Sequence, residues 1–145
     1  PEKGAWHGKA IETMARDVRR GCDLAAAGAP LIRKVIPVGE AWNRAFKAGV
    51  ADPNPYDGIA FGQVSLWTND HYHASSYGYY LEALMIFGDL TGLDPRALGG
   101  AERAAGDLGI SQAQATALQK VAFDELTATK DRPPLKAFKP VKLPR

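Results

Sequence analysis

Apolar residues recur at intervals of three and four in two stretches of the chain, with charged or polar residues between them. This spacing puts the apolar side chains on one face of a helix, so each stretch is predicted to be helical. A further helix is predicted to start near Ser75 or Ser76, whose hydroxyls can accept the first unpaired backbone N–H groups, and to run through Leu81, Leu84, Met85 and Phe87. A fourth helix is predicted by the capping box Ser111-x-x-Gln114, and Asp94-Pro95 predicts a short helix ending near Leu98. The four longer helices are expected at residues 8–28, 40–48, 75–92 and 111–130.

Two other stretches have the character of strands. Residues 31–38 are short, rich in β-branched side chains and bounded by Pro30 and Gly39. A second extended piece is expected within residues 61–67, before a polar cluster. The resulting order of helix, strand and helix predicts an α/β layer architecture.

Composition and charge narrow the possible functions. The 145 residues are 46% hydrophobic and 23% charged, which is typical of one globular domain. A net charge of +2 is too small to indicate a nucleic-acid partner. No apolar run approaches the ~20 residues that a membrane-spanning helix needs. Cys22 is the only cysteine, which excludes an intrachain disulfide and a cysteine-based zinc site.

The last fifteen residues differ from the rest of the chain. Residues 131–145 contain four prolines, five basic residues and one acidic residue, a net charge of +4. Such a sequence does not form a helix and is expected to run extended over the surface or free of it.

The candidate chemistry lies in a polar loop that contains Asp70, His71 and His73. The loop is predicted to follow an extended piece and precede a helix, a place where α/β proteins often hold reactive side chains. An aspartate three residues before a histidine can accept the Nδ1 proton of the imidazole and leave Nε2 free as a base. The spacing therefore indicates the base half of a hydrolytic triad.

The residues around this pair strengthen the interpretation. Residues 69–84 read NDHYHASSYGYYLEAL, and this pattern resembles the final sequence block of the SGNH (GDSL-type) serine esterases. The upstream IPVGEAW, residues 36–42, is also similar to a segment in some branches of that family. The resemblance implies that Asp70 orients His73 and that His73 is the general base of a Ser-His-Asp triad, whereas His71 does not match the pattern.

The resemblance also implies a fold and a division of the chain. Residues 1–92 are expected to be the C-terminal part of an SGNH hydrolase-like domain, a three-layer α/β/α sandwich with a parallel, flavodoxin-like sheet. Residues 93–130 would be an appended helical segment, and residues 131–145 a basic, proline-rich tail. Many members of the resembled family are exported, which favours a secreted or periplasmic location, although the sequence itself leaves the compartment open.

The family's Gly-Asp-Ser nucleophile motif does not occur in this chain. The four serines, Ser65, Ser75, Ser76 and Ser111, lie outside Gly-Asp-Ser and Gly-x-Ser-x-Gly motifs. The chain is therefore expected to be part of a larger hydrolase and inactive by itself. Its expected partners are an N-terminal segment of that hydrolase carrying Gly-Asp-Ser and a small ester substrate, with no cofactor.

Three alternatives stay open. His71, His73 and Asp70 offer the ligand types of a metal site. Trp67 and Tyr72 flank the loop and are candidates for lining an acyl or alcohol pocket, although partial burial against neighbouring helices explains them equally well. The chain is also compatible with a non-catalytic interaction or accessory module that uses its basic tail to dock a partner.

Overall fold

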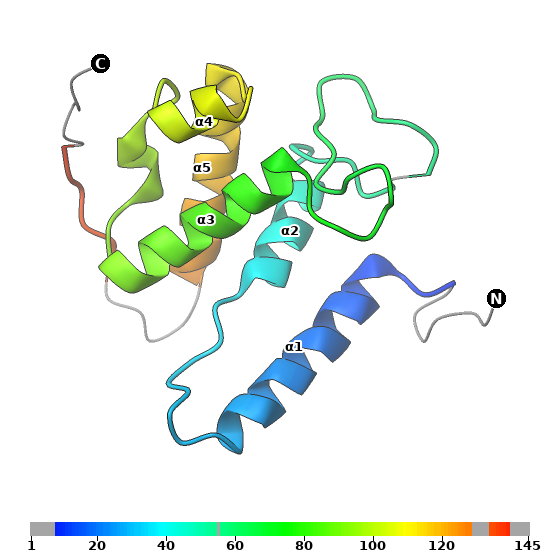
Figure 1. Cartoon of the computed structure of the whole chain (residues 1–145), viewed down its shortest axis with the longest axis vertical. Helices are drawn as coiled ribbons and strands as arrows, with labels where there is room; N and C mark the ends of the chain where they lie inside the picture. Colours follow the sequence, from blue (N-terminus) through cyan, green and yellow to red (C-terminus); the bar gives the residue numbers. More distant parts are fainter. Residues whose placement is uncertain (1–7, 55, 129–133, 140–145) are drawn as a thin grey trace.

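The computed structural model describes residues 8–54, 56–128 and 134–139. Over this part of the chain it is helical, and the helices enclose one core (Figure 1). The elements are α1 (Ile11–Ala27), α2 (Val38–Lys47), α3 (Ser76–Thr91), the 3-10 helix η1 (Pro95–Leu98), α4 (Arg103–Asp107) and α5 (Gln112–Ala128).

The predicted α/β sandwich is wrong, because the described residues contain no strand and no sheet. Residues 32–37 form no regular element and pair with no strand, and Val38 already begins α2. Near the second predicted strand there are only isolated bridges, between Ala51 and Val64 and between Trp67 and Ala74. A strand needs a partner along its edge, and β-branched residues without such a partner form no sheet.

The helix predictions from sequence are confirmed for α1, α2, α3, η1 and α5, with boundaries shifted by a few residues. Ser75 is the N-cap of α3, and its side-chain oxygen accepts hydrogen bonds from the N–H groups of Tyr77 and Gly78. Ser111 and Gln114 form the predicted reciprocal capping box, at 3.3 Å and 2.9 Å. The short helix α4 was not predicted. None of the helices in the described ranges is long and apolar enough to cross a membrane.

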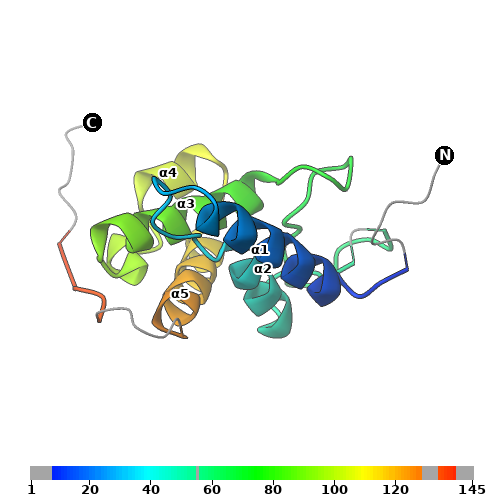
Figure 2. The same cartoon turned by 90° about the horizontal axis from the view of Figure 1, so that it is seen from below.

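The core lies between α2, α3 and α5, which stand against one another in both views (Figures 1 and 2). Helix α3 supplies Leu81, Leu84 and Met85, and α5 supplies Leu118, Val121 and Leu126. Side chains from both sides of residue 92 therefore pack into the same core. Burial of these aliphatic side chains supplies the main favourable free energy for folding.

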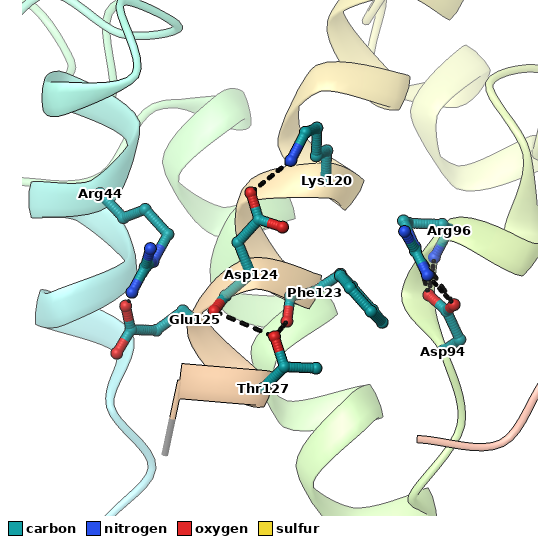
Figure 3. Close-up of polar contacts among 8 residues, drawn as sticks. All are labelled: Arg44, Asp94, Arg96, Lys120, Phe123, Asp124, Glu125 and Thr127. Carbon is teal, nitrogen blue, oxygen red and sulfur yellow. Dashed lines mark hydrogen bonds and ion pairs between the residues drawn. The ribbon is translucent and has the colours of Figure 1, made fainter. Parts of the chain in front are cut away.

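Polar contacts fix α5 against its neighbours, as Figure 3 shows. Nε of Arg44 on α2 lies 2.7 Å from Oε2 of Glu125 on α5. On the other side of α5, the guanidinium of Arg96 lies 3.3 Å from the centre of the Phe123 ring and also pairs with Asp94 at 2.8 Å. The cation–π contact joins η1 to α5, whereas the ion pair lies within η1 and its cap and holds the Arg96 side chain.

Helix α1 is attached less firmly. It runs antiparallel to α2 (Figure 1) and contains no buried residue. Nη1 of Arg19 reaches Oε1 of Glu40 at 2.9 Å, which links the two helices. The segment that follows α1 is anchored by Lys34, whose ammonium group pairs with Asp89 of α3. Helix α1 therefore covers α2 without joining the central core.

Part of the proline-rich tail lies within the described residues. Residues 134–139 run along the C-terminal end of α3, where the N–H of Lys136 donates to the Gly92 carbonyl and the Lys136 carbonyl accepts from Asp94, both at 2.8 Å. The Phe138 ring lies 5.6 Å from that of Phe87. This part of the tail is extended over the surface, as expected, whereas residues 131–133 and 140–145 lie outside the described ranges.

Candidate functional site

The candidate site is carried by the loop of residues 67–75, called the site loop below. The loop folds back on itself, because the N–H of Thr68 donates to the His73 carbonyl at 2.9 Å and Trp67 bridges Ala74. At the end of the loop, the N–H of Ser75 donates to the Leu66 carbonyl at 2.8 Å. Leu66 is fully buried, so the loop is tied directly to the core.

Asp70 is the centre of the hydrogen bonds inside this loop. Its Oδ2 lies 2.6 Å from Nδ1 of His73, the contact expected from the spacing of the two residues. Its Oδ1 accepts from the hydroxyl of Thr68 and from the N–H groups of Tyr72 and His73, the latter two at 3.0 Å and 2.9 Å. Four donors thus converge on one carboxylate.

These contacts set the charge of the carboxylate and the tautomer of the imidazole. The hydrogen bond from His73, followed by those from Thr68 and the two N–H groups, holds the pKa of Asp70 well below its usual range. An ionised carboxylate only accepts hydrogen bonds, so Nδ1 of His73 carries a proton. In neutral imidazole the remaining nitrogen, Nε2, then has a lone pair available as a base.

The pair is open to solvent, with 63% of the His73 side chain and 50% of the Asp70 side chain exposed. Exposed ion pairs contribute little to stability, so this contact is better understood as orienting the imidazole than as holding the fold together. Across the described part of the chain, Nε2 has no hydrogen-bond partner. The base position of the imidazole is therefore accessible to an incoming group.

His71 occupies a separate position. It has a positive φ of 57° at the end of a turn closed by its N–H and the Thr68 carbonyl, and its ring lies 4.6 Å from that of Tyr56. Among the residues that the structure describes, no three potential metal ligands come together. The geometry thus separates His71 from the pair of Asp70 and His73, and the arrangement required for the metal alternative is not formed.

Trp67 and Tyr72 both line a groove between α1 and α2. Trp67 stacks on Phe46 at 5.2 Å between ring centres and meets Trp42 edge-on at 5.3 Å. Tyr72 is 82% exposed and lies edge-on to the His73 ring at 4.9 Å. The two aromatic residues chosen from sequence thus share one groove, and a binding role for them stays a prediction.

Three of the four serine hydroxyls have hydrogen-bond partners other than His73. The Ser65 hydroxyl donates to the Trp67 carbonyl at 2.9 Å, and that of Ser75 donates to the Ser65 carbonyl at 2.6 Å. Ser111 belongs to its capping box, and Ser76 is an exposed residue in the first turn of α3. Within the described residues, none of these hydroxyls is hydrogen-bonded to His73.

Sequence reasoning missed Thr68, Gly78 and Trp42 as supports of the site. Thr68 precedes Asp70 by two residues, a spacing that suits a local hydroxyl-to-carboxylate hydrogen bond. A side chain at Gly78 would collide with the Leu66 carbonyl and the Trp42 ring, so α3 can approach the site loop only with glycine there. Gly78 lies inside the block of residues 69–84, whereas nothing local in the sequence points to Trp42.

Comparisons with known proteins do not extend this picture. No protein-family model, curated protein or solved structure matches the chain. A functional interpretation therefore rests on the local geometry of the site loop.

Proposed function

We propose that Asp70 and His73 are the orienting carboxylate and general base of a serine esterase, and that the nucleophilic serine comes from another segment of polypeptide. The observation that supports this function is the 2.6 Å contact between Asp70 Oδ2 and His73 Nδ1, with Nε2 left accessible. The resemblance of residues 69–84 to the SGNH esterases assigns the same two roles to the same two residues. The proposal does not depend on a sheet within this chain.

In the proposed reaction, Nε2 of His73 takes the proton of the serine hydroxyl while the serine oxygen attacks the ester carbonyl carbon. The imidazolium then returns that proton to the alcohol oxygen as the carbon–oxygen bond breaks, which leaves an acyl-serine. Water repeats the sequence, giving the carboxylic acid and the free serine. Asp70 holds the ring in position and stabilises the imidazolium through its negative charge.

The serine is assigned to a different segment because each of the four serines here has another position or role. Ser65, Ser75 and Ser111 are engaged in local hydrogen bonds, and Ser76 is not hydrogen-bonded to His73. The resemblance implies that the partner is an N-terminal segment carrying Gly-Asp-Ser, which would also supply donors to the oxyanion. Docking of such a segment would also shield the exposed dyad from water, which strengthens its electrostatic interactions.

The decisive experiment compares the two loop histidines in the protein assembled with its Gly-Asp-Ser segment. His73→Ala is expected to lower kcat for a small soluble ester by at least about 10³-fold, because the general base is lost. His71→Ala is the matched control and should change kcat far less. Equal losses for the two variants, restored by added zinc, would instead support the metal site.

A serine-directed phosphonate locates the nucleophile independently of turnover. The probe is expected to label the Gly-Asp-Ser serine and to leave Ser65, Ser75, Ser76 and Ser111 unmodified. The chain alone should neither react with the probe nor hydrolyse esters. Stoichiometric labelling of one of those four serines in the chain alone would overturn the proposal.

A further inference from the structure

An apolar groove runs between α1 and α2 and has a volume of about 320 Å³. Its walls are formed by aliphatic side chains of α1 and aromatic side chains of α2 and the site loop, among them Met14, Val18, Trp42, Phe46, Trp67 and Tyr72. A neighbouring hollow along α1 is lined instead by charged residues such as Arg16, Arg20 and Asp23. The two hollows share Arg19, Glu40 and Asn43, but only the apolar groove is lined by aromatic side chains.

Tyr72 connects the lining of the apolar groove with the proposed general base. Tyr72 lines the groove, and its ring lies 4.9 Å from the ring of His73. Trp67 lines it too and begins the site loop, held to Ala74 at the loop's other end. A ligand lying in the groove would thus bring one of its ends close to the imidazole.

The lining disfavours a charged ligand. Its two charged side chains, Arg19 and Glu40, are already paired with each other at 2.9 Å. An anion or cation would have to break that pair or remain uncompensated on an apolar surface, which is costly. An uncharged alkyl group gains instead from every methylene removed from water.

The size of the groove also fits a small molecule. A volume of about 320 Å³ is at the lower end of the range for small-molecule sites, roughly 300–1,000 Å³. The groove is therefore large enough for part of a small ester, such as an alkyl chain.

We propose that the apolar groove binds the alkyl part of the ester substrate and that its Tyr72 end presents the ester group to His73. This inference rests on the proposed function, since it names the substrate class for that site: uncharged esters with an alkyl chain of medium length. The alkyl chain belongs either to the acyl group or to the alcohol, and the lining accepts both.

The test is a binding measurement on the chain as it is, which needs no turnover. Methyl esters from methyl butanoate to methyl dodecanoate are titrated while tryptophan fluorescence and the NMR signals of Tyr72 and His73 are recorded. Affinity should rise with each added methylene, by up to about fourfold, and level off once the alkyl chain fills the groove. The isomers methyl nonanoate and octyl acetate carry the same alkyl chain, in the acyl group of the first and in the alcohol of the second. The isomer that shifts the NMR signals of the His73 ring more identifies the part of the ester that lies in the groove.

Matched variants localise the binding. Tyr72→Ala should weaken binding of methyl nonanoate several-fold, whereas Tyr79→Ala changes an exposed tyrosine of α3 outside the groove and should leave it unchanged. On α1, Val18→Glu places a charge in the groove and should abolish the dependence on chain length. Leu24→Glu, which faces the charged hollow, should preserve it.

The outcomes separate this inference from the proposed function. Affinity that does not depend on chain length, or equal losses for Tyr72→Ala and Tyr79→Ala, would overturn the groove assignment and leave the His73 experiment unaffected. Normal turnover in His73→Ala, with length-dependent ester binding intact, would remove the proposed catalysis and keep the groove as an alkyl-binding site.

Discussion

The core and the site loop are held together in different ways. In the core, Leu118 and Leu126 are fully buried between helices that are distant in sequence. In the site loop, the side chains of Asp70 and His73 are at least half exposed and are held by local hydrogen bonds. The core depends on the removal of apolar surface from water, which requires several helices at once. The site loop depends on one carboxylate whose donors all lie within three residues of it.

Because of this difference, the core and the site loop can be altered independently of each other. Local hydrogen bonds allow the dyad to form before any substrate or partner is present, and they cost the fold little if they are lost. Loss of core packing has a larger effect, because the free energy of unfolding of a small domain is only about 5–15 kcal/mol. Variants in the two regions should therefore have separable effects on stability and on the site.

The largest effect on stability is expected in the core. Leu118→Ala removes a fully buried side chain of α5 and should lower the free energy of unfolding by about 2–5 kcal/mol, because it leaves a cavity as well as losing burial. Urea denaturation followed by circular dichroism measures this change in the free energy of unfolding. Leu90→Ala, at a side chain that is 72% exposed, is the control and should cost far less. Similar losses for both variants would show that the core is not packed as described.

A smaller effect is expected where the core meets the site loop. Gly78→Ala adds a methyl group against the Leu66 carbonyl and the Trp42 ring, and the resulting overpacking should cost about 1–3 kcal/mol. It should also shift the NMR signals of His73, because α3 must move away from the loop. Gly106→Ala is a suitable control, since an added methyl group there meets no neighbour. Unchanged His73 signals in a destabilised Gly78→Ala variant would contradict this coupling.

Ser75 joins the loop to α3 through its hydroxyl. Ser75→Ala removes the α3 cap and the hydrogen bond to the Ser65 carbonyl, and should cost about 0.5–2 kcal/mol in thermal or urea unfolding. Ser76→Ala, one residue further on at an exposed position, is the matched control and should cost less. Equal effects would mean that the cap contributes nothing measurable.

The smallest effect on stability is expected from protonating Asp70. The pKa of this carboxyl is held below its usual range, first by the hydrogen bond from His73, so its stabilising contribution is complete above pH ~4 and is lost only as the pH falls through the lower folded value. Carbon-13 NMR of the carboxyl should give a midpoint below about 3.9. Thr68→Val removes one donor and should raise that midpoint. A midpoint at or above the ordinary value in the unmodified chain would contradict the hydrogen bonds described.

The sequence by itself determined the features that arise from contacts close along the chain. The amphipathic spacing predicted α1 and α2, the capping serines predicted the start of α3, and Ser111 with Gln114 predicted the start of α5, because helices and caps form within a few residues. The contact between Asp70 and His73 followed from a three-residue spacing in the same way. The catalytic roles of the two residues remain predictions.

Only the tertiary structure decided the layer architecture and the surroundings of the site. Residues 31–38 are rich in β-branched side chains that suit a strand, but a strand forms only beside a partner strand, and none is present in the described part of the chain. The grouping of Trp42, Phe46 and Trp67 likewise unites residues about 20 positions apart. Such contacts depend on how helices pack, which periodicity along the chain does not specify.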